Sequence, residues 1–254
     1  MHLRLFALLA STLLVAASVR ADSYSFKEPF TKSGPFSPTG TLTVHNINGK
    51  ITVRTWDKQE IQIEGEKSAK TEEELQMIDL TIDVSESRAD LKVKLPKRKD
   101  GWFGGNTIRA AVSFTITVPA TATLESVSTV NSSVDIENVQ GPVHAESVNG
   151  NVHASNLGSS AKLETVNGSI RADFTAVPAG QELDFETVNG GVKVRLPADA
   201  GFKLRASVVN GHVDCDFPIQ LSSRGRRSLH GTVGDGRASV KAESVNGSIS
   251  IEKR

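Results

Sequence analysis

The sequence predicts an all-β fold, a β-solenoid whose rungs are about 18–22 residues long. Three observations lead to this prediction. A short phrase, of which ETVNGSIRA at residues 164–172 is one copy, recurs along the chain. Apolar residues alternate on both sides of the phrase, and Asn-Gly, the strongest short turn signal, lies at the centre of most copies.

The copies of the phrase align on one asparagine, which is Asn48, Asn131, Asn149, Asn167, Asn189, Asn210 and Asn246 in turn. From the second copy onward the spacings are 18, 18, 22, 21 and 36 residues, and the last is twice 18. A period near 20 indicates stacked repeats of one supersecondary unit. We expect the stacked asparagine side chains to form an amide ladder. An asparagine surface that binds a ligand is the alternative.

Apolar or small residues occupy fixed positions around each asparagine. They lie six and four residues before it, one before it, and three and five after it; around Asn149 they are Val143, Ala145, Val148, Val152 and Ala154. Period-two alternation predicts two strands per copy, each with one buried face. A second turn signal, NVQG at 138–141, completes a rung that buries its apolar residues by stacking. At the Asn-Gly corner we expect Gly168 to need a positive φ.

Residues 1–21 have the pattern of a secretory signal peptide. A positively charged start precedes an apolar run of 15 residues at 5–19, and small residues flank Arg20 before the expected cleavage site. The run is too short for a comfortable membrane span. We therefore expect an exported mature chain without a transmembrane helix, located in the periplasm, at the cell surface or outside the cell.

The rest of the chain divides into three stretches. Residues 22–40 predict an extended segment, residues 41–120 an N-terminal β-strand region of the solenoid, and residues 121–254 regular repeats with an interruption at 218–236. Within the second stretch, alternation predicts strands at 61–64, 80–84, 91–95 and 111–118. The charged segment 68–77 predicts either one or two helical turns or a solvated excursion. The helix content should be very low.

Composition narrows the function classes. Lys and Arg number 29 and Asp and Glu 29, so no net charge directs the chain to nucleic acid. The one cysteine, Cys215, excludes an internal disulfide and is expected to be a small buried residue, since it follows the corner asparagine by five. No G-x-S-x-G, H-E-x-x-H or P-loop motif is present, and we predict no catalytic residues and no cofactor.

Charged residues form two further columns. Glutamates stand three residues before the asparagine in four copies, at Glu146, Glu164, Glu186 and Glu243. Cations five residues before it, at Lys162, Arg205 and Lys241, share that strand face and can neutralise them. A weak Ca²⁺ site is the alternative, although the acidic loop motifs of such sites are absent.

His144, Glu146 and His153 belong to one copy, and these residue types can bind a metal ion. The two histidines flank the corner, so we expect them to face different directions. Zinc needs three or four convergent ligands. The sequence therefore predicts surface histidines and no metal site.

Two segments that interrupt the repeats are the candidate ligand-binding loops. The first joins three cations to two aromatic residues and contains Lys97, Arg98, Lys99, Trp102 and Phe103. The second contains Arg224, Arg226 and Arg227. Such clusters suit an anionic envelope component, namely a lipid headgroup, lipopolysaccharide or an acidic glycan, or an envelope protein. The alternative is a flexible basic hairpin tip.

Several motifs together carry a family resemblance. They are LTVHNINGKITVRTWDKQEIQIEGE at 42–66, a strand ending in Val-Pro at 114–119, the T-V-N-G copies, and GTVGDGRASVKAESVNGSISI at 231–251. With these motifs the chain resembles, over residues 26–254, the putative-adhesin family of exported bacterial β-strand-repeat proteins, a domain of unknown function related to the head GIN domain. The resemblance implies a single-stranded, right-handed β-helix in the bacterial envelope. It implies no catalytic residues, and some relatives act in envelope-stress or antimicrobial-peptide responses.

The leading functional hypothesis is an exported, non-enzymatic binding or adhesin-like envelope module. A structural envelope spacer is the second hypothesis, and a carbohydrate-active β-helix enzyme is the third. The repeated acids argue against the third, because glycoside chemistry needs a paired carboxylate site on one face.

Overall fold

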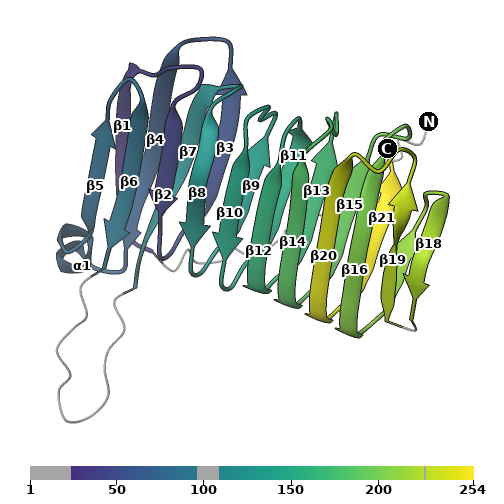
Figure 1. The fold of residues 1–254 in the computed structure, drawn as a ribbon. Coiled ribbons are helices and arrows are strands. Elements are labelled where there is room, and N and C mark those ends of the chain that lie inside the picture. The colour runs from purple at the N-terminus through teal and green to yellow at the C-terminus, as the bar shows by residue number, and fades with distance from the viewer. Residues whose placement is uncertain (1–23, 96–108, 226) are drawn as a thin grey trace, which may run out of the picture.

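The computed structural model describes residues 24–95, 109–225 and 227–254. In this part of the chain nearly all regular structure is β-strand, which confirms the all-β prediction. Two open sheets lie face to face and enclose one apolar core between them (Figure 1). The α-helix α1 (Glu72–Gln76) is five residues long. Among the described residues, no helix is long and apolar enough to cross a membrane.

Each sheet is described by its strand order. The ten-stranded sheet runs β1 (Phe26–Pro35), β4 (Glu60–Ala69), β7 (Ala110–Pro119), β3 (Ile51–Trp56), β9 (Val134–Glu137), β11 (Val152–Leu157), β13 (Ile170–Phe174), β15 (Val192–Leu196), β21 (Ile249–Lys253), β17 (Val213–Cys215). The eleven-stranded sheet runs β18 (Ile219–Arg224), β19 (Ser228–Val233), β16 (Phe202–Asn210), β20 (Ala238–Asn246), β14 (Glu182–Asn189), β12 (Ala161–Asn167), β10 (Val143–Ser147), β8 (Thr123–Thr129), β2 (Thr41–His45), β6 (Arg88–Lys94), β5 (Asp79–Val84).

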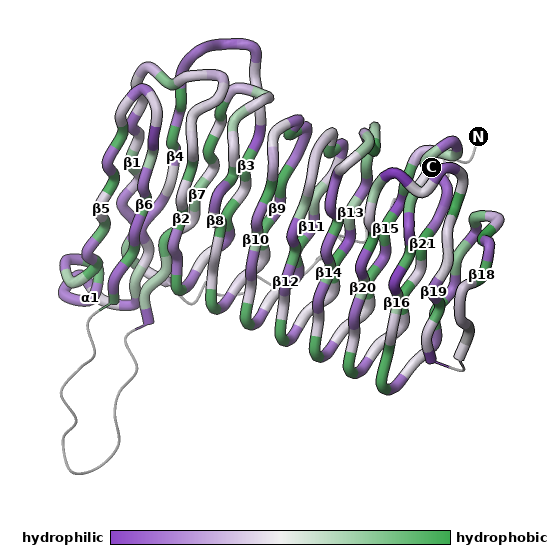
Figure 2. Tube along the Cα trace, in the orientation of Figure 1, coloured by the Kyte–Doolittle hydropathy of each residue, from purple (hydrophilic) through white to green (hydrophobic). Residues whose placement is uncertain are grey.

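Each sequence repeat contributes one strand to each sheet. The pairs β10–β11, β12–β13 and β14–β15 stack in parallel register, so that Ala145 pairs with Leu163 and Leu163 with Phe185. These side chains are fully buried. Apolar and polar residues alternate along the strands (Figure 2). The alternation therefore builds a core between the sheets, and the right-handed winding implied by the family resemblance stays a prediction.

The N-terminal half contains the strands that alternation predicts. Residues 61–64 lie in β4, 80–84 in β5, and 111–118 in β7, while 91–94 lie in β6. The charged segment before β5 forms α1, whose N-cap is Thr71; its Oγ1 accepts a hydrogen bond from the Glu74 backbone N–H at 3.2 Å. A side-chain cap of this kind satisfies one of the unpaired donors of the first turn.

The stacking order departs from the chain order at both ends, which corrects the simple picture of successive rungs. The last pair, β20–β21, lies between β14–β15 and β16–β17. The first pair, β2–β3, likewise lies between β6–β7 and β8–β9. The spacing of 36 residues before Asn246 therefore does not skip a rung. It holds the antiparallel hairpin β18–β19, after which the chain returns into the stack.

Seven asparagines form a continuous ladder of side-chain hydrogen bonds along the corner. Each Nδ2 donates to the Oδ1 of the next asparagine at 2.8–2.9 Å, in the order Asn210, Asn246, Asn189, Asn167, Asn149, Asn131, Asn48. At the end of this row Asn48 Nδ2 donates to the backbone oxygen of Ala110 at 2.8 Å. Every corner is thereby joined to its neighbour by side-chain as well as backbone bonds.

A second row of hydrogen bonds lies just inside the ladder. Five of the seven asparagines have a buried Ser or Thr two residues before them, whose hydroxyl donates to a corner carbonyl of the neighbouring rung; these residues are Thr129, Ser147, Thr165, Thr187 and Ser244. Thr165 Oγ1 donates to Gly150 O at 2.8 Å, and Thr187 Oγ1 to Gly168 O at 2.9 Å. These bonds satisfy carbonyls that would otherwise be buried without a partner.

The corner glycine has a different role from the expected one. Gly168 does not have a positive φ, although the corner glycines Gly49, Gly211 and Gly247 do. A Cβ on Gly168 would instead lie 2.0 Å from the backbone oxygen of Gly150 in the next rung. Glycine is needed at this corner because in-register stacking leaves no room for a side chain.

Cys215 is only half-buried, which corrects the expectation of a buried residue. It lies in β17, the edge strand of the ten-stranded sheet, so a neighbouring strand covers it on one side only. Burial raises the pKa of its thiol, with the charge of Asp216 acting in the same direction.

We predict that Gly168→Ala lowers the free energy of unfolding by about 2–3 kcal/mol, because a backbone carbonyl cannot move aside as a flexible side chain would. Gly180→Ala is the control. Gly180 has a φ of +80° but no heavy atom within 4 Å of the added Cβ. Backbone strain alone should cost it about 1 kcal/mol. Urea unfolding measures the free energy of unfolding of both variants. An equal loss of stability in the two variants would contradict the close packing at the Gly168 corner.

We predict that Cys215 reacts with a thiol reagent in the native state, more slowly than in urea. Partial burial restricts access, and the raised pKa of the thiol lowers the thiolate fraction near neutral pH. Absorbance stopped-flow measures both rates. A thiol that is unreactive without denaturant would show that another segment covers the edge of β17.

Candidate functional site on the outer face of the eleven-stranded sheet

The outer face of the eleven-stranded sheet carries three columns of side chains. In β12, Leu163 and Thr165 point into the core, so the residues between and beside them, Lys162, Glu164 and Val166, point outward. Parallel register repeats this arrangement in β10, β14 and β20. Positions five, three and one residue before the asparagine therefore form a charged column, an acidic column and an apolar column.

The apolar column consists of valines that face solvent. Their side chains are between 38% and 52% exposed, and in stacking order they are Val130, Val148, Val166, Val188, Val245 and Val209. The sequence pattern counts this position as apolar, yet the structure places it outside the core. Four of these valines lie in β12, β14, β20 and β16, and Val130 and Val148 directly follow β8 and β10, so that a continuous apolar row runs beside the asparagine ladder.

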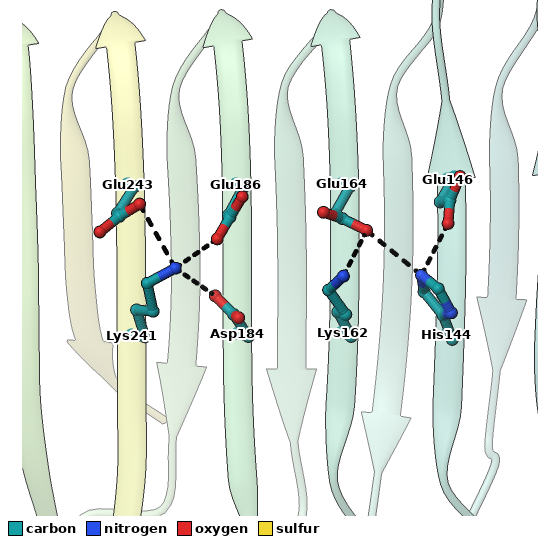
Figure 3. A network of polar contacts seen from close by, with 8 residues as sticks. All are labelled: His144, Glu146, Lys162, Glu164, Asp184, Glu186, Lys241 and Glu243. Carbon is teal, nitrogen blue, oxygen red and sulfur yellow. Dashed lines mark hydrogen bonds and ion pairs between the residues drawn. The ribbon is translucent and has the colours of Figure 1, made fainter.

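The acidic column is partly neutralised, as the sequence predicts. Lys241 Nζ contacts Glu186, lies 3.3 Å from Glu243 Oε2 and 3.6 Å from Asp184 Oδ1 (Figure 3). The hydrogen bond to Glu186 is the main cause that raises the pKa of Lys241. Lys162 Nζ lies 2.9 Å from Glu164 Oε2. Each lysine thus offsets the glutamates of its own rung or the adjacent one.

His144 lies between two glutamates of adjacent rungs. Its Nε2 is 2.8 Å from Glu146 Oε1 and 3.2 Å from Glu164 Oε2 (Figure 3). Burial acts to raise the pKa of Glu164, but hydrogen bonds from Lys162 and His144 outweigh it, and the net pKa is lowered. Among the described residues, this group brings three potential metal-ligand atoms within 4.8 Å of one another. His153 lies in β11 of the other sheet, as its place beyond the corner predicts.

A shallow groove of about 820 Å³ follows these columns across β8, β10, β12, β14, β20 and β16. The valine row forms part of its lining, and the glutamates Glu146, Glu164, Glu186 and Glu243 form another part. A smaller groove of about 500 Å³ lies on the outer face of the ten-stranded sheet and is lined by His153, Arg171, Lys193 and several serines. The first groove is longer and combines apolar with acidic groups.

The loop residues proposed from the sequence are mostly not placed by the structure. Lys97, Arg98, Lys99, Trp102, Phe103 and Arg226 lie outside the described residues. Arg224 ends β18, and Arg227 is exposed just before β19.

Sequence reasoning missed the valine row and the contact of His144 with Glu164. The sequence carries a signal for both. The positions five, three and one residue before the asparagine alternate with buried positions and so share one outward face, and aligning adjacent copies places their side chains next to one another.

The comparisons with known proteins agree with this architecture. Residues 140–252 match the family described as Toastrack DUF4097. The match covers a little under half of the chain. The family resemblance drawn from the sequence is thereby confirmed. No curated protein sequence matches the chain significantly.

Several solved structures are similar to this chain. A putative cell adhesion protein from Clostridium sporogenes is 16% identical with a TM-score of 0.52, over 89% of this chain and 100% of that chain. A putative adhesin from Bacteroides fragilis is 12% identical with a TM-score of 0.37, over 88% and 97% of the two chains. A putative lipid binding protein from Parabacteroides distasonis is 12% identical with a TM-score of 0.24, over 89% and 96%. At 16% identity, the first match supports the fold.

The carboxylate of Asp184, which lies within residues 140–252, has little hydrogen bonding or opposite charge to offset its burial. Asp184 Oδ1 is buried without a hydrogen-bond partner, because the nearest cation, Lys241 Nζ, lies 3.6 Å away. Burial is the main cause that raises the pKa of Asp184, and the charge of Glu186 adds to it, while Lys241 opposes it. A carboxyl whose pKa is raised on folding destabilises the folded state as the pH rises through that pKa.

We predict that Asp184→Asn raises the melting temperature near neutral pH, and that the difference from wild type disappears as the pH falls below the raised pKa of Asp184. Thermal melts between pH 3 and pH 8 measure this. Glu243→Gln is the matched control, since this more exposed carboxylate should change the melting temperature little. A less stable Asp184→Asn variant at neutral pH would show that the attraction to Lys241 outweighs the cost of burial.

Proposed function

We propose that this chain is an exported, adhesin-like binding module that holds an elongated ligand in the groove on the outer face of the eleven-stranded sheet. The observation that carries the proposal is the row of six half-exposed valines along that groove. At the usual spacing of paired strands the row extends about 24 Å. A contiguous exposed apolar surface on a water-soluble protein is typical of an interaction site.

The charges beside the row favour a particular ligand chemistry. Five carboxylates face this groove region, at Glu146, Glu164, Asp184, Glu186 and Glu243, against the cations Lys162, Lys241 and Arg205. A ligand that buries apolar groups against the valines and places cationic or hydrogen-bonding groups near the carboxylates would be complementary.

The groove is also rigid. Each valine is attached to a strand with paired neighbours, and each corner is fixed by the asparagine ladder. A pre-organised surface loses little conformational entropy when a ligand binds. A structural spacer would gain only the modest packing of neighbouring valines from such a row, while the exposed apolar surface invites association.

The basic loop at Lys97, Arg98 and Lys99 stays a second candidate site, for an anionic envelope component. Its charge is opposite to that of the acidic column, so the two candidates predict different ligands. This difference allows a direct test.

We predict that changing Val148, Val166 and Val188 together to Ser weakens ligand binding with little loss of stability, because substitutions at exposed positions usually cost within about 0.5 kcal/mol each. Biolayer interferometry would measure binding to anionic vesicles, zwitterionic vesicles, lipopolysaccharide and peptidoglycan fragments. The matched comparison is a triple Lys97, Arg98 and Lys99 to Ser variant. We expect the valine variant to lose at least about tenfold in affinity, and the loop variant to bind as wild type does.

The opposite result would move the binding site to the basic loop. A wild-type protein that binds none of these components would favour the structural spacer. Two variants that both bind as wild type does would show that the binding site lies on neither of these surfaces.

A further inference from the structure

We propose that His144, Glu146 and Glu164 form a surface site for a divalent transition-metal ion, with Zn²⁺ as the best match. The site lies on the same face as the groove but does not depend on the ligand proposed above. It arises from the parallel pairing of β10 with β12, in which Glu146 lies beside Glu164 and His144 beside Lys162. His144 and Glu146 are two residues apart on one strand and share its outer face. One imidazole is therefore placed between two carboxylates.

The geometry is close to that of a bound ion. His144 Nε2 lies 2.8 Å from Glu146 Oε1 and 3.2 Å from Glu164 Oε2, and all three ligand atoms lie within 4.8 Å of one another. In tetrahedral zinc sites the bonds are about 2.0–2.2 Å, which separates ligand atoms by roughly 3.4 Å. The two distances from His144 Nε2 lie slightly below this value.

The ligand types favour zinc over the hard cations. Ca²⁺ and Mg²⁺ prefer oxygen ligands throughout, whereas an imidazole nitrogen with carboxylates suits Zn²⁺. The three side chains are between 28% and 45% exposed, so solvent or a ligand group can fill the remaining coordination position. A site with three protein ligands and one open position is the usual arrangement of zinc that binds an exchangeable group.

The Lys241 cluster provides an internal comparison. There the carboxylates of Asp184, Glu186 and Glu243 surround an ammonium group. At His144 the centre is occupied by an imidazole, and among the described residues Lys162 forms its one ion pair with Glu164, at 2.9 Å. The lysine is thus a competing cation at the margin of the site. Removing its charge should strengthen metal binding, which a purely structural ion-pair network would not do.

The test is isothermal titration calorimetry of the tag-free, EDTA-treated protein with ZnCl2, CaCl2 and MgCl2. Wild type should bind one Zn²⁺ per chain and bind Ca²⁺ and Mg²⁺ far more weakly. His144→Ala and Glu164→Gln should each weaken Zn²⁺ binding at least about tenfold. Lys162→Gln should tighten it about fivefold, as expected for loss of a neighbouring unit charge near the surface.

His153→Ala is the matched control, because His153 lies on the other sheet, and it should bind Zn²⁺ as wild type does. Thermal melts show that each variant is folded, and Zn²⁺ should raise the melting temperature of wild type but not of His144→Ala. The Val148, Val166 and Val188 variant should keep its zinc, which separates this site from the groove. Absence of one-to-one binding, an unchanged affinity in His144→Ala, or weaker binding in Lys162→Gln would overturn the proposal.

Discussion

In-register stacking at the asparagine corner is the constraint on which the rest of the structure depends. Three contacts enforce it: the amide ladder, the hydroxyl of residues such as Thr165 on the neighbouring corner carbonyl, and the close approach of Gly168 to Gly150. A shift of one residue would break all three and turn each strand's apolar side chains toward solvent. Because the corners are aligned, every position of the repeat becomes a column in space. The core, the charged columns and the valine row are all consequences of that alignment.

Columns of like residues form a continuous surface, but they also bring like charges close together. Stacked glutamates at the spacing of adjacent strands repel, and the chain offsets them with Lys162 and Lys241 on the same face. These pairs are half-exposed, so they add little stability. Their effect is on the character of the face, which remains acidic near the valines. The zinc site and the groove both follow from side chains of different rungs meeting on this face, and neither could arise within a single repeat.

The two ends of the stack differ from its middle in how their strands are paired. A parallel stack that simply stopped would expose unpaired strand edges and invite association with other chains. Here the first and last rungs of the chain are inserted one position inside the stack. Antiparallel strands continue the sheets beyond the parallel rungs, β1 and β4 at one end and β18 and β19 at the other, so that β1 and β18 become edge strands. The edge strand β17 is only three residues long, which limits the exposed edge on its side and leaves Cys215 half-buried.

The sequence by itself determined the all-β class, the strands, the corners and the column of asparagines, because the period of two and the Asn-Gly signals are local and recur in every copy. It also placed Glu164 and Lys162 on one outward face. Tertiary structure alone decided which copies stack together. The insertion of Asn246 between Asn189 and Asn210 depends on the packing of both neighbours, and no local pattern encodes it. The exposure of the valines, the close approach that requires Gly168, and the meeting of His144 with Glu164 were decided in the same way, since each depends on contacts between residues of different rungs.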